Sequence, residues 1–563
     1  MAGPTRAHAR FLQTPVHRRF ILWSQWQVVE LVVGCSGPAM SAFSSSAPIN
    51  GSSSQRAPAR PAANRMAQAD DARLPAWDGA AMKRLVETRL GGAQIIVVSN
   101  RQPHSHVWRN GAIDVEPAPG GMVTALEPIV RACEGTWLAH GSGSADRAVV
   151  DGAQRWRATA KTGSYQLRRV WLSKPQQRGH GDFFSNAGLW PICHLANVRP
   201  SFTQPDWAHH VDVNRLFADA VVRETQRPDP VVLVQDYHLA LVPAMVRELL
   251  PRATLVSFWH IPWTHYEQMR QCPWLSEIVA GLQGSDIVGF QTAQHAAHFK
   301  AAARAVGAVD ARSFESAVRV YPISIAWPSS RHTDPTSTLV QTQARDLERA
   351  RWNVPAAGKL VVGVDRLDPT KGLVQRVHAI KALLGPHPAW QGLLRFVQVA
   401  APTRVGVAGY AALHQLLKGE VQRVNARYAS AGWEPITLLD HAQDRERVNA
   451  LYRASDVCLV TSLHDGMNLV SKEFVAARDD EQGVLVLSKF AGSACALGQA
   501  LLVNPHELRS VAQTLHEALT LPALEQRSRM RALRATVKSN NVFRWGAHML
   551  TDALALRESR AAA

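Results

Sequence analysis

The feature that most constrains the fold is an alternation of short apolar runs with amphipathic stretches, which starts at Gln94. Helical patterns such as Val407–Ser430 and Arg445–Ala454 separate the runs. The first set of runs is Ile95–Val98, Gln166–Trp171, Val231–Val234, Thr254–Trp259, Asp286–Phe290 and Val318–Ile323. The second set is Leu360–Val364, Arg395–Val399, Ile436–Leu439, Val457–Val460, Val484–Leu487 and Leu501–Val503. Val/Ile/Leu runs between helices are typical of parallel strands covered on both faces, so the sequence predicts an α/β protein with two doubly wound, Rossmann-like domains.

The two sets of strands predict where the domains divide. We expect one domain over residues 93–340 and a second over 341–540, with the join inside Pro328–Gly358. The last residues, 541–563, contain the helical pattern Trp545–Arg557 and are expected to cross back onto the first domain. Ligands of open α/β sheets bind beyond the carboxyl ends of the strands, so the expected site is a cleft between two facing domains.

Residues 1–92 lack this alternation and are expected to form a disordered extension. Ser41–Arg65 is rich in Ser, Ala and Pro and has no core-forming pattern. Phe20–Val33 is too short and too polar to span a bilayer, and the preceding Arg18-Arg19 resembles a signal sequence only faintly. We expect a flexible tail, a cytoplasmic protein and no membrane association. Alternative starts are Met40, Met66 and Met82.

The net charge of +17 does not by itself indicate nucleic-acid binding. Residues 1–92 contribute 11 Lys/Arg against 5 Asp/Glu, and the remaining excess is dispersed without a run of basic and aromatic residues. A positive site for phosphorylated substrates explains this excess equally well. The six cysteines form no CxxC pair and there is no HExxH motif, so reduced thiols and no metal are expected.

Two segments carry the strongest local signals for anion binding. Thr461–Glu473 follows an apolar run and predicts a strand, a polar turn and the start of a helix, where free N–H groups and the helix dipole favour anions. Upstream, Arg366–Gly372 (RLDPTKG) also follows an apolar strand. Its arginine can grip two phosphate oxygens and its lysine supplies a compact charge. A surface Arg and Lys beside a helix start would be the alternative if this segment stood alone.

Seven motifs in order resemble a known family. They are IIVVSNR (95–101), PGG (119–121), LWP (189–191), QDYHL (235–239), WHIPW (259–263), RLDPTKG (366–372) and HDGMNLVSKEF (464–474). Over roughly residues 93 to 555 the chain resembles the trehalose-6-phosphate synthases, retaining GT-B glycosyltransferases of family 20. The resemblance implies transfer of glucose from a nucleotide-glucose, expected to be UDP-glucose, to glucose 6-phosphate, giving α,α-trehalose 6-phosphate. It implies neither a cofactor nor a metal.

The resemblance also assigns the donor side of the site. Arg366 and Lys371 would stabilise the leaving diphosphate, while Asp465 would bind the hydroxyls of the donor glucose. Glu473 would hold both ribose hydroxyls. A glycine loop would close over the diphosphate, and backbone after Asp465 would line the nucleotide. The glycine loop comprises Gly120 and Gly121. The backbone segment comprises Gly466, Met467, Asn468, Leu469 and Val470.

On the acceptor side, the resemblance implies that Arg101 and Arg404 bind the phosphate. Asp236 would orient an acceptor hydroxyl and His260 would contact the transferred sugar. Trp137 and Trp190 resemble aromatic residues near the acceptor, although tryptophans, like His260, are equally often core residues. No carboxylate stands out as a nucleophile. The family resemblance implies a front-face mechanism, in which the leaving phosphate helps to deprotonate the incoming hydroxyl.

Several positions depart from the family pattern. Gly181 stands where a tyrosine usually helps to hold the acceptor phosphate, and the adjacent His180 is a candidate replacement. Other departures are Pro369, His464 and Thr264. The alternatives are therefore a glucosylglycerol-phosphate synthase that uses glycerol 3-phosphate, and a catalytically weak protein that senses sugar phosphates. The base of the donor stays open, as does self-association, because sister enzymes often form homo-oligomers.

Overall fold

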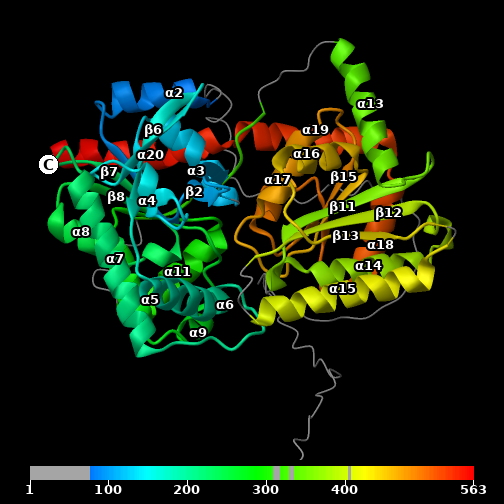
Figure 1. Cartoon of the computed structure of the whole chain (residues 1–563), viewed down its shortest axis with the longest axis horizontal. Coiled ribbons are helices and arrows are strands. Elements are labelled where there is room, and N and C mark those ends of the chain that lie inside the picture. Colours follow the sequence, from blue (N-terminus) through cyan, green and yellow to red (C-terminus); the bar gives the residue numbers. More distant parts are fainter. Residues whose placement is uncertain are drawn as a thin grey trace, which may run out of the picture. The chain divides into compact units, whose positions relative to one another are not determined.

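Two separate β-sheets of parallel strands organise the chain in the computed structural model (Figure 1). The structure describes residues 77–562 apart from 119, 308–316, 329–334, 404–407 and 431, and only the backbone of 335–341, 408 and 561. Both sheets belong to the compact unit Pro75–Ala563. The predicted division into domains 93–340 and 341–540 stays a prediction.

The first sheet contains every apolar run predicted for this half of the chain. In spatial order its strands are β10 (Val318–Val320), β9 (Ile287–Phe290), β8 (Thr254–Trp259), β7 (Val231–Gln235), β1 (Ile95–Arg101), β4 (Thr136–His140), β6 (Gly163–Val170) and β5 (Arg155–Ala160). All neighbours are parallel except β5, which pairs antiparallel with β6. The sequence analysis did not identify β4 or β5. In β5 only Ala158 is buried, so this edge strand lacks a continuous apolar run.

The second sheet is entirely parallel and confirms all six strands of the second set. Its spatial order is β13 (Ile436–Leu439), β12 (Leu394–Ala401), β11 (Lys359–Arg366), β14 (Val457–Val460), β15 (Val484–Ser488) and β16 (Leu501–Val503). The chain order reverses between β11 and β14, and in the first sheet between β1 and β7. These reversals are the switch points at which open α/β sheets bind ligands.

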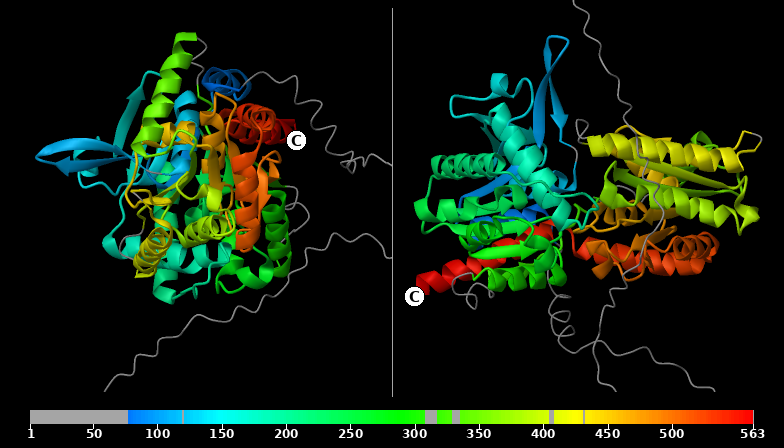
Figure 2. Two further views of the ribbon diagram at one scale, coloured as in Figure 1. Left: turned by 90° about the vertical axis from the view of Figure 1, so that its right-hand side faces the viewer. Right: turned by 90° about the horizontal axis from the view of Figure 1, so that it is seen from below.

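Helices cover both faces of each sheet, as the sequence predicted (Figures 1 and 2). Alternate residues of β1 enter different cores: Ile95 and Val97 pack into one, Ile96 and Val98 into the other. The helices of the first half are α2 (Gly79–Arg84), α3 (Gly121–Ala132), α4 (Asp146–Val149), α5 (Lys174–Gln176), α6 (Trp190–Cys193), α7 (Gln204–Glu224), α8 (Val242–Leu249), α9 (Tyr266–Met269), α10 (Leu275–Gln283) and α11 (Ala293–Ala305). Those of the second half are α13 (Pro335–Arg351), α14 (Leu373–Leu384), α15 (Ala408–Tyr428), α16 (Arg445–Ala454), α17 (Leu469–Ala477), α18 (Leu508–Thr520), α19 (Ala523–Ser539) and α20 (Val542–Ala562).

Shorter helical segments join several of these elements. The π-helical segments are η1 (Leu85–Arg89) and η2 (Gln177–Leu189). The 3-10 turns are η3 (Tyr237–Leu239), η4 (Pro369–Lys371), η5 (Pro388–Trp390) and η6 (Gly492–Cys495). Within the ranges that the structure describes, we find no helix with the length and apolar character needed to cross a membrane.

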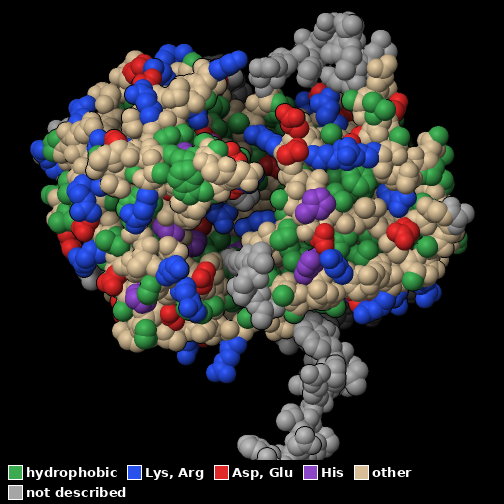
Figure 3. All heavy atoms as spheres, in the orientation of Figure 1, with side chains coloured by type: hydrophobic (Ala, Val, Ile, Leu, Met, Phe, Trp, Pro, Cys, Tyr) green, Lys and Arg blue, Asp and Glu red, His purple; other side chains and the backbone are tan. Residues whose placement is uncertain are grey.

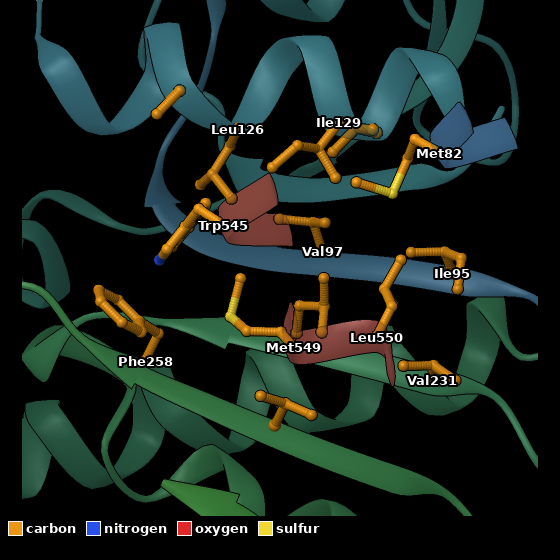
Figure 4. Packing of buried hydrophobic residues seen from close by; sticks show 14 of the residues in the cluster. Met82, Ile95, Val97, Leu126, Ile129, Val231, Phe258, Trp545, Met549 and Leu550 are labelled. Atoms are coloured by element: carbon orange, nitrogen blue, oxygen red, sulfur yellow. The ribbon is translucent and has the colours of Figure 1, made fainter. Parts of the chain in front are cut away.

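The final helix, α20, packs against the first sheet rather than the second. Trp545, Met549 and Leu550 share a core with Val97 of β1 and Phe258 of β8 (Figure 4). The Trp545 indole N–H also donates to the Tyr321 backbone carbonyl at 3.1 Å. Apolar burial of this kind contributes roughly 1.5–3 kcal/mol per large side chain. The end of the chain is therefore anchored on the element with which the alternation begins.

The disordered extension was predicted to reach residue 92, and this boundary is wrong. Residues 1–76 lie outside the described part of the chain, but helix α2 already begins at Gly79. The Asp78 carboxylate caps this helix by accepting from the Ala81 N–H at 2.8 Å. Met82 is fully buried and packs with Ile129 in the core that also contains Trp545 of α20 (Figure 4). A short helix with few apolar residues leaves no periodic signal in the sequence.

A two-stranded antiparallel sheet follows β1 and stands apart from the main sheet (Figure 2). It comprises β2 (His104–Arg109) and β3 (Ala112–Pro117), and the chain then leads into α3. The buried Asp146 carboxylate holds the base of this sheet. It accepts from the His106 backbone N–H at 2.8 Å and lies 3.2 Å from the Arg169 guanidinium. This hairpin links the end of β1 to the glycine loop before α3.

Candidate active site

A cavity of about 1900 Å³ opens at the carboxyl ends of both sheets. Arg101 ends β1 and Asp236 follows β7, at the switch point of the first sheet. Arg366 ends β11, and Asp465 follows β14, at the switch point of the second. All four residues line the cavity. Figure 3 shows the face hollowed near its middle, with Lys/Arg, Asp/Glu and His side chains around the hollow. The topology thus brings charged residues from distant parts of the sequence to one place.

On the first-sheet side, the Asp236 carboxylate binds the backbone of His260, and the His260 imidazole contacts Gln235. Asp236 has φ 73°, in the region that favours glycine. Its Oδ1 accepts the His260 backbone N–H at 3.2 Å, and burial raises its pKa to about 7. Burial lowers the pKa of His260 to about 3, so this imidazole is neutral. Its Nε2 lies 2.9 Å from Gln235 Oε1.

On the second-sheet side, Lys371 and Asp465 form a largely buried ion pair. Lys371 Nζ donates to Asp465 Oδ2 at 2.5 Å. Burial opposes ionisation of Asp465, but the Lys371 charge outweighs it and brings the Asp465 pKa to about 2. Burial likewise opposes the Lys371 charge, and the nearby carboxylates of Asp465 and Asp365 outweigh it, so the Lys371 pKa is raised. Both side chains are therefore charged at neutral pH.

The glycine loop approaches both sides of the cavity. Gly120 has φ 135°, and a Cβ on it would lie 3.2 Å from Arg101 Nη1. A Cβ on Gly121 would lie only 2.5 Å from Leu469 Cδ1. These contacts explain why the loop carries glycines here, since a side chain would separate it from the residues it covers. Pro119, the first residue of the motif, lies outside the described residues.

The start of α17 forms a further part of the wall. Asn468 is the N-cap: its side-chain oxygen accepts the Ser471 N–H at 2.9 Å. Burial raises the pKa of Glu473, one turn into the helix, to about 7. The predicted residues of this segment that line the cavity are Met467, Asn468, Leu469, Val470 and Glu473. Exposed N–H groups at a helix start suit the binding of an anionic or hydroxyl-rich ligand.

Gly466, predicted to line the nucleotide, has a different position. It is not among the described residues of the cavity wall. A Cβ on Gly466 would lie 2.5 Å from the His260 backbone carbonyl oxygen. The glycine therefore lets the turn after β14 pack directly against the loop after β8. This close approach places Asp465 and His260 around the same cavity.

Trp137, predicted to contact the acceptor, is a core residue, and that prediction is wrong. It lies on β4, is fully buried among apolar side chains, and does not belong to the described lining of the cavity. Its indole N–H donates to Ser99 Oγ at 2.8 Å. The sequence analysis missed β4, and inward alternation along that strand decides the direction of this side chain. Trp190, by contrast, lines the cavity, and Arg404 lies outside the described residues.

The departures from the family pattern also have structural positions. His180, the candidate replacement for the usual tyrosine, is buried and points to His210, with the two Nδ1 atoms 3.1 Å apart. It is absent from the described cavity wall, so it does not replace that tyrosine. A Cβ on Gly181 would meet no heavy atom within 4 Å. Thr264 donates to the Ile192 carbonyl at 3.2 Å, so its hydroxyl has a structural role.

The cavity wall includes residues that the sequence analysis did not identify. Asp365 and His238 stand beside predicted residues, but sequence does not show which neighbour points into a cavity. Asn186 and Gln291 come from η2 and from the loop after β9. Arg445 is the first residue of α16, which follows β13 on the second sheet. The rule that ligands bind where strands end could have identified Arg445.

Two doubly wound sheets with charged switch points on one cavity define the class of GT-B glycosyltransferases. The chain belongs to glycosyltransferase family 20, whose model matches residues 93–555. Among curated relatives, the trehalose-6-phosphate synthase of Mycobacterium avium is 40% identical over 486 residues, covering 83% of this chain and 96% of the relative. That of Mycolicibacterium vanbaalenii is 38% identical over 490 residues, covering 84% and 98%.

Solved structures give the same result. The α,α-trehalose-phosphate synthase (UDP-forming) from Burkholderia vietnamiensis matches with a TM-score of 0.69 and 31% identity, covering 82% of this chain and 99% of that one. The enzyme from Burkholderia xenovorans in complex with glucose-6-phosphate matches with a TM-score of 0.69 and 30% identity, covering 82% of this chain and 99% of that one. The Escherichia coli protein bound with UDP-2-fluoro glucose matches with a TM-score of 0.69 and 29% identity, covering 82% of this chain and 99% of that one.

Proposed function

We propose that the chain transfers glucose from UDP-glucose to glucose 6-phosphate with retention of configuration, giving α,α-trehalose 6-phosphate in trehalose biosynthesis. The observation that carries the proposal is the shared cavity. Fixed cations and a paired carboxylate lie at one switch point, and an arginine, a buried carboxylate and a neutral imidazole lie at the other. One side suits a sugar diphosphate and the other suits a phosphorylated acceptor.

The donor side has the charges that departure of a nucleoside diphosphate requires. Negative charge develops on the diphosphate as the glycosidic bond breaks, and preorganised cations in a partly buried site stabilise it. Lys371 is held in its charged form, and Arg366 ends β11, just before the η4 turn that carries Lys371, on the same cavity. The glycine loop at Gly120 and Gly121 can bring backbone N–H groups close to phosphate oxygens. Asp465 and Glu473 are the acceptors for the glucose and ribose hydroxyls.

The acceptor side has matching chemistry for a phosphorylated sugar. Arg101 supplies a cation for the phosphate, and Asp236 supplies a carboxylate for the attacking hydroxyl. His260 is neutral, so it can accept or donate a hydrogen bond without adding positive charge near the breaking bond. We propose that the leaving phosphate takes the proton of the acceptor hydroxyl on the same face. The Lys371 pairing of Asp465 supports this mechanism, because a carboxylate held by an ammonium is a weak nucleophile.

The relatives support the substrates as well as the reaction. Solved relatives are described as UDP-forming, as bound with UDP-2-fluoro glucose and as complexed with glucose-6-phosphate. Gly181 is the observation that favours testing a second acceptor, because the chain lacks the tyrosine expected from the family pattern. The second candidate function is a glucosylglycerol-phosphate synthase that uses glycerol 3-phosphate.

The test supplies UDP-, ADP- or GDP-glucose together with glucose 6-phosphate or glycerol 3-phosphate, and measures release of the nucleoside diphosphate. We expect UDP release with glucose 6-phosphate, and the product's anomeric configuration follows from its NMR couplings. Release with glycerol 3-phosphate alone would move the assignment to the second candidate. Absence of release with every pair would contradict the proposed function.

A further inference from the structure

Beneath the donor wall, a fully buried arginine binds several backbone and side-chain groups at once. Arg376 lies in the first turn of α14 and has no exposed surface. Its Nε donates to Thr461 Oγ1 at 2.8 Å, and Nη1 donates to Gln398 Oε1 at 3.3 Å. Its Nη2 donates to the Asp365 carboxylate and, at 3.3 Å, to the Lys371 backbone carbonyl. The guanidinium thus has partners on all of its edges.

These partners belong to the segments that carry the donor residues. Asp365 directly precedes Arg366 on β11, and Lys371 is bound through its own carbonyl. Thr461 begins the turn that leads to Asp465, and its hydroxyl also donates to the Gly372 carbonyl at 3.0 Å. One rigid, planar side chain therefore connects the strand end, the η4 turn and the turn after β14.

The fold makes room for this arginine at specific points. A Cβ on Gly363 would lie 2.8 Å from Arg376 Nη1, so any larger residue on β11 would displace the guanidinium. Gly372 has φ 62°, and a Cβ there would lie 2.1 Å from the Thr461 carbonyl oxygen. The η4 turn can therefore approach the turn after β14 only with a glycine at this position.

Arg376 also balances charge near the diphosphate position. Asp365 lines the cavity and is itself buried, close to Lys371 and Asp465. Without the guanidinium, its carboxylate would be a second negative charge competing for Lys371, on the wall where a diphosphate binds. A buried carboxylate that loses its guanidinium partner also becomes more costly to keep ionised.

We propose that Arg376 is a positioning residue for the donor site, holding Arg366, Lys371 and Asp465 in one arrangement and compensating Asp365. This inference rests on the proposed function, and it concerns the donor only. The acceptor side shares none of the contacts just described. A loss of Arg376 should consequently appear in the kinetics with UDP-glucose and leave acceptor binding unchanged.

The experiment compares Arg376→Met, Arg376→Lys and the double variant Asp365→Asn/Arg376→Gln with the wild-type chain. Steady-state UDP release gives kcat and the two KM values, and calorimetry gives the Kd of UDP alone. We expect Arg376→Met to lower kcat/KM for UDP-glucose at least about 30-fold, with the KM for glucose 6-phosphate within about twofold. Arg376→Lys should restore part of the loss, since lysine keeps the positive charge but lacks the planar guanidinium with its several N–H donors. The double variant should exceed Arg376→Met in rate, because it leaves no unpaired carboxylate.

Arg395→Met is the matched control. Arg395 is also buried, on β12 of the same sheet, but its guanidinium donates to the Glu434 carbonyl and not to any donor segment. We expect this variant to unfold at lower temperature with an unchanged KM for UDP-glucose. Unchanged donor kinetics in all Arg376 variants, or an equal donor defect in Arg395→Met, would overturn the inference. If Arg376→Met does not fold, the Lys variant and the double variant decide by the same criteria.

The two proposals fail in different ways. A wild-type chain that releases no UDP with any acceptor contradicts the proposed function. An active wild-type chain whose donor kinetics ignore Arg376 contradicts only the positioning role.

Discussion

Replacement of Lys371 by methionine separates its effect on stability from its effect on chemistry. The pair with Asp465 is largely buried, with 15% and 12% of the two side chains exposed. The Asp465 pKa of about 2, against an ordinary value of 3.8, corresponds to roughly 2 kcal/mol in favour of the charged form. Because the folded-state pKa is depressed, this stabilisation is present above pH of about 4 and is lost as pH falls toward 2. At neutral pH the free energy of unfolding of Lys371→Met should therefore be lower than that of the wild type by at least this amount.

The chemical effect should be larger than the effect on stability. Removing a preorganised cation from a site of developing negative charge costs about 3–4 kcal/mol, so kcat for UDP release should fall by about 10² to 10³. The double variant Lys371→Met/Asp465→Asn tests which effect dominates, because the neutral pair restores most of the stability. Thermal unfolding and UDP release are measured on both variants. A double variant with nearly wild-type kcat would refute a direct role of Lys371 on the leaving group.

Three further outcomes test other parts of the site. Arg366→Ala should lower kcat/KM for UDP-glucose at least tenfold, about 1.4 kcal/mol, and an unchanged rate would exclude a contact with the diphosphate. Because burial raises the Glu473 pKa to about 7, protonation at lower pH should weaken ribose binding. The KM for UDP-glucose should therefore rise between pH 8 and 6 in wild type but stay flat in Glu473→Gln. Trp137→Phe should lower stability by about 1–3 kcal/mol with a glucose 6-phosphate KM within about twofold, and a large KM change would restore its acceptor role.

Most strands were predictable where a sheet is covered on both sides, although the interior strand β4 was missed. Val231–Gln235 and Val457–Val460 are buried at every position, and the apolar runs Val231–Val234 and Val457–Val460 mark them in the sequence. The edge strand β5 and the two hairpin strands were missed because few of their residues are buried. Ala112–Pro117 has no buried position, so its sequence carries no apolar period.

The direction of individual side chains was less predictable than the elements. Trp137 and Trp190 are equally plausible as core or site residues in sequence, yet Trp137 on β4 packs into the core and Trp190 lines the cavity. The difference comes from strand alternation in an unrecognised strand and from the position of α6. His180 likewise stands beside the expected position but turns inward onto His210. The direction of each of these side chains depends on the residues that pack around it.

The two sets of parallel strands and the short segments that carry chemistry were readable from the sequence, because burial on both faces and turn residues leave local patterns. Which of those segments meet depends on how the chain folds in three dimensions. Lys371 and Asp465 are separated by 94 positions, and the Nζ–Oδ2 distance of 2.5 Å exists because β11 and β14 are neighbours in the sheet. Arg376 illustrates the same point: its burial between three segments follows from close packing, which depends on the whole fold and leaves no periodic signal.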